Sequence, residues 1–197
     1  MRISDDRYSR DRLRLDVAMH FIQHEARTRT IRLWTGLTDD RIRKLYRSYH
    51  AAAGPRPARH RGRSPQQSGF FLRTARLREH SAALASLCSL VGLLGDPQAP
   101  GAHGTPTAEQ PTAASGIARA ALLCHAYDAY RHYVHDPAIS FEHAVLLLAR
   151  LQRGVELRLS CCRGCGALRV GDAFGLRPPR CTLCAPPAAH GAGRQPV

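Results

Sequence analysis

At 197 residues, the chain can form one core, or one core with a small appended module, but not several large domains. Its formal net charge of +14 favours polyanionic partners, of which nucleic acid is the first. Lys44 is the only lysine among 29 basic residues. Arginine suits phosphates and guanine edges because of its planar fork, although the same bias can come from the base composition of the coding sequence.

The N-terminus and the apolar stretches contain no targeting or membrane signal. Charged residues occur throughout 1–15, which argues against a secretory signal. The longest mostly apolar stretch, 82–94, is shorter than the ~20 residues that span a bilayer. We therefore expect a cytoplasmic protein without a membrane span. In that reducing compartment, paired cysteines are better explained as metal ligands than as disulfides.

Helical periodicity predicts three helices in the first part of the chain. Apolar residues at i, i+3, i+4 and i+7 place one face of a helix over about 13–25 in the core. A second helix is expected over about 26–35, where Gly36 permits a tight turn. A third begins after Thr38, which can cap it, and covers about 39–52. The apolar residues of the first helix are Leu15, Ala18, Met19 and Ile22.

Further along, helices alternate with segments rich in glycine and proline. Residues 54–69 predict a basic linker or extended arm, and 95–116 a mobile loop. Between them, one apolar helical stripe runs from Leu77 to Leu94. Another helix from Ile117 leads to one that Ser140 can cap. The residues of this last helix expected to face inward are Phe141, Val145, Leu148 and Val155.

These patterns predict a mainly α fold with a small C-terminal module. A helical domain is expected over 1–157, with flexible segments at about 53–69 and 95–116. After Leu159, large apolar residues are few, so 158–187 needs a cross-link to fold, and we expect a four-cysteine zinc module with a β-like hairpin. The tail, 188–197, is expected to be disordered.

The cross-link is indicated by two C-x2-C pairs, which are Cys162 with Cys165 and Cys181 with Cys184. Each pair can present two thiolates to one ion from a tight turn, and residues 166–180 between the pairs are expected to form the hairpin. Four thiolates fill a tetrahedron, so the zinc would be structural. Cys161 could replace Cys162 at a C-x3-C spacing, and an iron–sulfur cluster or a redox dithiol is a further alternative.

The second and third predicted helices resemble a helix-turn-helix over 26–49. Apolar residues and Gly36 occupy the positions that let two helices pack across a turn, whereas Arg32 stands where the motif usually has a small residue. The exposed side of the second helix would then reach phosphates or base edges, although a solvated amphipathic helix has the same pattern. The basic residues on that side are Arg41, Arg43, Lys44 and Arg47.

Together these features resemble the FlhC family, the C subunit of the bacterial flagellar transcription activator. Residues 148–166 read LARLQRGVELRLSCCRGCG and 181–187 read CTLCAPP, which is similar to the family's helix leading into its zinc site. The segment 37–47 and the cluster Phe70-Phe71-Leu72 are similar to the family's N-terminal region. The chain departs from the family in the segment 95–116, in the lack of tryptophan in the aromatic cluster and in its short tail.

The resemblance implies a function and a set of partners. The four paired cysteines would bind one structural Zn²⁺, and the chain would assemble with an FlhD-like subunit into a hetero-hexamer. That complex would bind promoter DNA of flagellar genes and recruit RNA polymerase. Basic residues at the zinc module are expected to contact the DNA backbone with the helical face. They are Arg163, Arg169, Arg177 and Arg180.

Two other classes of function were weighed against a DNA-binding activator. A zinc hydrolase or deaminase needs an open metal position and an H-x-E carboxylate, neither of which the cysteine motif offers, so we expect no enzyme. An RNA-binding zinc-module protein would suit the charge equally well. RNA-binding proteins usually expose aromatic residues for stacking, and only 6% of these residues are aromatic, which favours DNA.

Overall fold

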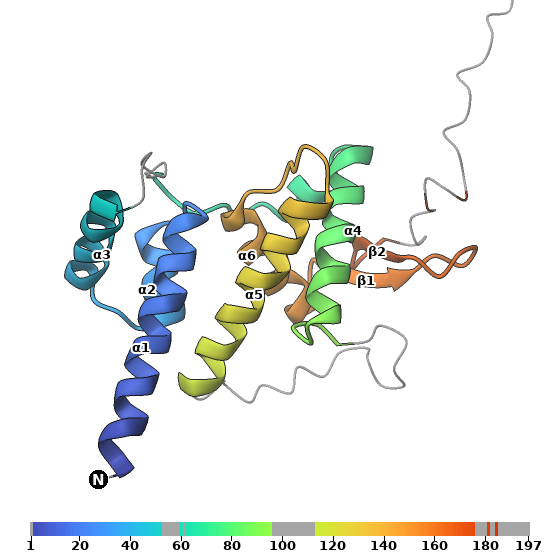
Figure 1. Ribbon diagram of the computed structural model, residues 1–197. Coiled ribbons are helices and arrows are strands. Elements are labelled where there is room, and N and C mark those ends of the chain that lie inside the picture. Colours follow the sequence, from blue (N-terminus) through green and yellow to red (C-terminus); the bar gives the residue numbers. More distant parts are fainter. Residues whose placement is uncertain are drawn as a thin grey trace, which may run out of the picture.

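The computed structural model describes residues 2–52, 60, 62–95, 113–175, 181 and 184, and is mainly helical, as predicted (Figure 1). Helices and a C-terminal hairpin follow one another along the chain. They are α1 (Arg2–Gln23), α2 (Thr28–Thr35), α3 (Asp39–Ala52), the 3-10 helix η1 (Ser68–Leu72), α4 (Ala75–Leu90), α5 (Ala113–Tyr133), α6 (Phe141–Arg153), β1 (Leu157–Cys161) and β2 (Leu168–Asp172).

The first three helices match the predicted pattern, apart from where α1 begins. That helix starts at Arg2 rather than near residue 13, so it extends beyond the apolar stripe that predicted it. Gly36 ends α2 in the left-handed region, with φ of 69°. The Oγ of Thr38 accepts the backbone N–H of Arg41 at 3.4 Å, which confirms the cap of α3.

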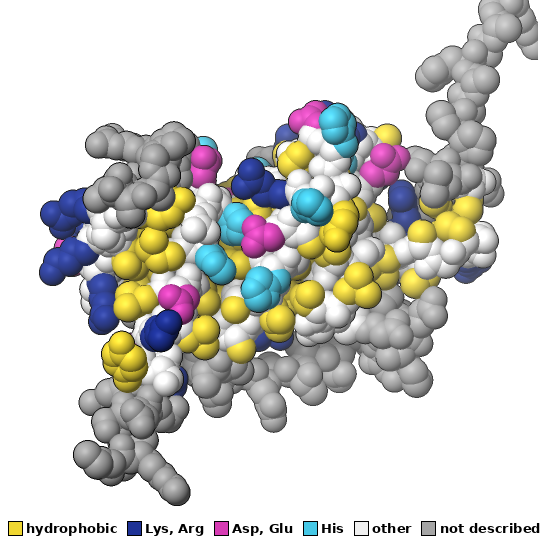
Figure 2. Space-filling model, in the orientation of Figure 1, with side chains coloured by type: hydrophobic (Ala, Val, Ile, Leu, Met, Phe, Trp, Pro, Cys, Tyr) yellow, Lys and Arg dark blue, Asp and Glu magenta, His cyan; other side chains and the backbone are white. Residues whose placement is uncertain are grey.

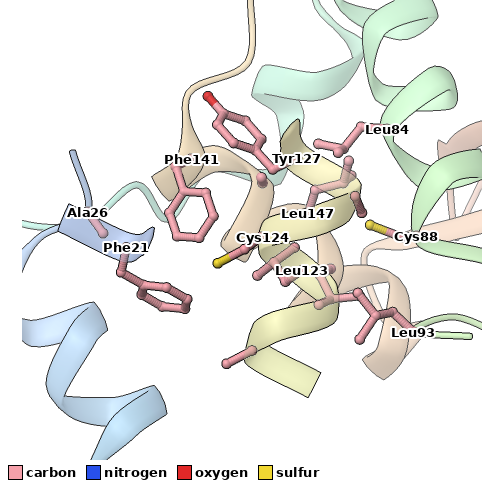
Figure 3. Packing of buried hydrophobic residues seen from close by; sticks show 14 of the residues in the cluster. Phe21, Ala26, Leu84, Cys88, Leu93, Leu123, Cys124, Tyr127, Phe141 and Leu147 are labelled. Carbon is pink, nitrogen blue, oxygen red and sulfur yellow. The ribbon is translucent and has the colours of Figure 1, made fainter. Parts of the chain in front are cut away.

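One hydrophobic core joins α1 to α5 and α6 (Figure 3). Phe21 of α1 meets Phe141 of α6 edge to face, with ring centroids 4.8 Å apart. Cys88 of α4 and Cys124 of α5 are buried, as expected for small hydrophobic residues. Burial raises the pKa of both thiols to about 12, so neither is a nucleophile at neutral pH.

Hydrogen bonds from buried side chains hold the loop between α5 and α6 against α4. The Tyr130 hydroxyl accepts the backbone N–H of Ile139 at 3.2 Å and lies 2.7 Å from Nδ1 of His80. The same Nδ1 lies 3.2 Å from the backbone nitrogen of Ala138, so it accepts hydrogen bonds from both groups. Ser140 then caps α6 by accepting the N–H of His143 at 3.4 Å, as predicted.

The hairpin packs on the helical body through one face. β1 and β2 are antiparallel, and Leu157 and Val170 of their inner face belong to the same core as the helices. The expectation that Val155 faces inward is wrong: α6 ends at Gly154 in the left-handed region, and Val155 beyond it is 60% exposed. In Figure 1, the hairpin and α3 lie at opposite ends of the molecule.

Several predicted segments lie outside the described residues. These include part of the proposed linker (53–59 and 61), most of the proposed loop (96–112) and the tail from 188 onward. Within the described part, the proposed flexible segments are partly ordered, since η1 begins at Ser68 and α5 at Ala113. None of the described helices has an apolar stretch that would span a bilayer.

Candidate metal centre

Four cysteine side chains meet beyond the tip of the hairpin. The Sγ atoms of Cys162, Cys165, Cys181 and Cys184 all lie within 4.8 Å of one another, so the group can hold a metal ion. In the described part of the chain, no other cluster of potential ligands has this geometry. Cys161 is the last residue of β1 and stands outside the group, which answers the question of register in favour of Cys162.

The hairpin encloses the first cysteine pair instead of lying between the two pairs, so the expected position of the hairpin was wrong. Its strands flank residues 162–167, and the N–H of Cys162 donates to the carbonyl of Ala167 at 2.8 Å directly beyond the ladder. Gly166 closes the turn with φ of 73° and donates to the carbonyl of Cys162. The alternation of leucines at 157 and 159 explains why the strand precedes the cysteines.

A second tight turn presents the other two sulfurs. The N–H of Cys184 donates to the carbonyl of Cys181 at 3.0 Å. Cys162 and Cys181 are buried, whereas Cys165 and Cys184 are exposed, so the group sits at the surface with one side covered. A Cβ atom on Gly164 would lie 3.0 Å from Sγ of Cys184, so a side chain at this residue would require one of the two turns to shift by a few tenths of an ångström.

Backbone hydrogen bonds and neighbouring sulfurs shift the pKa values of two of these thiols in opposite directions. Hydrogen bonds from the backbone of Gly164, and then of Cys165 and Cys181, lower the pKa of Cys162 to about 6. Close contact with the sulfurs of Cys165 and Cys162 raises the pKa of Cys184 to about 12. Crowded thiolates repel one another, and a divalent cation among them removes that repulsion by its own charge.

The predicted DNA-binding helix is held by its apolar side and exposes its basic side. Ile42 is fully buried, and the hydroxyl of Tyr46 donates to the carbonyl of Ala26 at 2.9 Å, which fixes α3 on the end of α1. Arg32 does not disturb this packing, because it points to solvent and lies 3.6 Å from Asp39. Exposed basic side chains gather along the α3 edge in Figure 2. On α3 they are Arg41, Arg43, Lys44 and Arg47.

The arginines expected to contact DNA from the zinc module do not share one environment. Arg163 is exposed in the turn between the first two cysteines. Arg169 lies on β2 with only 6% exposure, so the described fold does not present its side chain to a phosphate. Arg177 and Arg180 lie outside the described residues. Because α3 and the hairpin are at opposite ends, the structure does not join Arg163 to the basic face of α3 (Figure 1).

Sequence analysis missed one group of polar residues. Arg27 and His60 line two adjoining cavities beside α2, although 54–69 was interpreted only as a linker or arm. The basic run ARHRGRS at 58–64 was the available signal. No pattern in the sequence predicted that this basic run would lie against the start of α2.

In comparisons with known proteins, no protein-family model and no curated protein matches this chain.

Proposed function

We propose that this protein is a DNA-binding transcription activator subunit of the FlhC type, acting in the cytoplasm with an FlhD-like partner on flagellar promoters. Its C-terminal cysteines would bind one structural Zn²⁺. The observation that supports the proposal most is the four-sulfur group at the tip of a hairpin, on a helical body with a basic helix at its other end. The motif resemblance at 148–166 and 181–187 is what connects this architecture to flagellar genes.

The zinc would act as a cross-link. Cys162, Cys165, Cys181 and Cys184 would fill the four positions of a tetrahedron, which would leave none open for a water nucleophile or a substrate. The second pair, Cys181 and Cys184, has few large apolar neighbours in its own segment, 176–187, so metal binding would supply the free energy that orders this segment. We therefore assign the ion no role in catalysis.

The basic side of α3 would provide the main DNA contact. Arg43 lies 2.8 Å from Asp40 and is partly neutralised, whereas Lys44 and Arg47 are exposed and have no ion pair with a described residue. Each phosphate that a basic residue neutralises releases counterions and adds about 0.9 to the slope of log affinity against log salt. Arg163 would meet a separate stretch of backbone.

The decisive experiment measures zinc content and retention of duplex DNA by the protein co-expressed with an FlhD-like partner. Wild type is expected to contain one zinc per chain and to retain DNA, and Cys165→Ser to lose both. Lys44→Gln/Arg47→Gln should keep the zinc, weaken DNA binding and lower the salt slope by about 2. The matched control is Arg12→Gln/Arg153→Gln, which removes the same charge from exposed sites elsewhere.

The outcomes separate the alternatives. If the α3 variant and the control weaken DNA binding equally, the effect is net charge and α3 is not the contact face. If zinc is present but the complex ignores duplex DNA and retains RNA, the RNA-binding alternative replaces this proposal. Absence of metal from wild type would refute the structural zinc.

A further inference from the structure

Two adjoining cavities open beside the start of α2, away from the cysteine group. Each has a volume of about 430 Å³, and they share Arg27 and His60. The first reaches between the ends of α1, α5 and α6, and the second lies between the start of α2 and the segment around Arg63. Each volume is within the range of small-molecule sites, about 300–1,000 Å³.

Among the described residues, the second cavity is lined by basic and hydroxyl side chains and by no carboxylate. Its polar lining consists of Arg27, Thr28, Arg29, His60, Arg63 and Ser64. Arg29 and Arg63 are exposed and form no ion pair with a described residue. The first turn of α2 contains no acidic residue, and its N-cap makes no side-chain hydrogen bond. The partial positive charge of the helix N-terminus therefore adds to that of the arginines.

Two side chains at these cavities have buried nitrogen atoms that make no hydrogen bond within the described residues. Nε and Nη1 of Arg27 are inaccessible to solvent, and neither has a hydrogen-bond partner in the described part of the chain. The side chain of His24, which lines the first cavity, is 5% exposed. Its Nε2 lies 3.2 Å from Oδ1 of Asp128, but neither ring nitrogen makes a hydrogen bond within the described residues. Unpartnered buried polar groups of this kind are costly unless something binds them.

The carboxylates nearby are already engaged. Oε2 of Glu25 lies 2.9 Å from Nε2 of His60, and Oε1 of Glu142 accepts the backbone N–H of Arg27 at 2.8 Å. Neither carboxylate is among the residues that line the second cavity. The free hydrogen-bonding capacity there is therefore that of donors, which fits an anion with several acceptor oxygens.

From this geometry we propose that the two cavities form a binding site for a phosphorylated small molecule. Its phosphoryl group binds Arg27, Arg29 and Arg63 in the second cavity. The remainder of the ligand extends into the first cavity, against the rings of Tyr127 and Phe141 and within reach of His24. The site is separate from the α3 face, so this proposal does not depend on DNA binding.

A small ligand fits better than a phosphate of a DNA backbone. Arg27, Arg29 and Arg63 line a cavity, whereas the basic side chains of α3 stand on an exposed helix face, and Arg27 has its Nε and Nη1 below the surface. The adjoining first cavity gives room for a ligand body of metabolite size, with aromatic walls that a duplex backbone would not use.

The test is titration calorimetry of the zinc-loaded full chain in a phosphate-free buffer. The probes are 5′-AMP, as a phosphomonoester with an aromatic portion, and inorganic phosphate. Wild type is expected to bind 5′-AMP saturably, at one site and more tightly than phosphate. Arg29→Gln/Arg63→Gln should lose about ten-fold or more in affinity for both probes, since it removes charge-assisted hydrogen bonds from exposed positions without disturbing the core.

Two further variants make the result decisive. Arg12→Gln/Arg153→Gln removes the same charge elsewhere and should bind as wild type does, and so should Lys44→Gln/Arg47→Gln on α3. Equal loss in either variant, or no saturable binding by wild type, would overturn the proposal. It would also be overturned if Arg29→Gln/Arg63→Gln weakened duplex DNA binding while wild type ignored both small probes, because the arginines would then be a backbone contact. Failure of the DNA proposal leaves the expected 5′-AMP result unchanged.

Discussion

Replacing Gly164 with alanine is expected to weaken metal binding while every ligand stays in place. The added Cβ would lie 3.0 Å from Sγ of Cys184, which is closer than an ordinary van der Waals contact. One of the two turns must therefore move by a few tenths of an ångström. A sulfur bound to zinc at about 2.3 Å cannot move that far without distorting the tetrahedron.

The magnitude follows from the cost of overpacking. Inserting a methyl group into a closely packed site costs about 1–3 kcal/mol, which corresponds to a loss of zinc affinity of about 5-fold to 150-fold. Competition with a chromophoric chelator measures this directly. Arg163→Ala, in the same turn but with an exposed side chain, is the control and should bind zinc as wild type does. Unchanged affinity of Gly164→Ala would refute the inference that Gly164 is required by the close fit of the two turns.

The helical body gives further predictions that can be tested separately. Tyr130→Phe leaves the buried N–H of Ile139 without its acceptor and should lower the free energy of unfolding by about 1–3 kcal/mol; a loss below 0.5 kcal/mol in denaturant titrations would contradict this. Burial lowers the pKa of His80 from its ordinary 6.5, so the neutral form stabilises the fold above that pH and this contribution is lost as the pH falls below it. Below that pH, the free energy of unfolding of wild type should therefore fall more steeply with pH than that of His80→Gln, by at most about 1.4 kcal/mol per pH unit. Parallel slopes would exclude His80 as the cause. With pKa values of about 12, Cys88 and Cys124 should resist a thiol reagent at pH 8 until the protein unfolds, and fast labelling of either in native protein would show that it is accessible.

The features of this protein that could be predicted from its sequence are local ones. Helix ends were predictable where a single residue caps or ends the helix, as with the left-handed Gly36 and the caps Thr38 and Ser140. The helical periodicity likewise predicted that Ile22 is buried. The cysteine pairs were predictable for the same reason: C-x2-C is a local solution for presenting two sulfurs from one turn.

Contacts between residues far apart in the sequence could not be predicted and follow from the tertiary fold. Arg169 was expected to contact DNA because it is basic and close to the cysteine pairs, but in the fold it is buried on β2. The hairpin forms around the first cysteine pair because Leu157 and Val170 belong to the helical core. The spacing between the cysteines does not predict these core contacts. Likewise, the basic run near His60 was interpreted as a linker, and it becomes the wall of a cavity only because the chain returns to the start of α2. Burial and cavity formation depend on contacts between segments far apart in sequence, whereas periodicity and spacing describe neighbours along the chain.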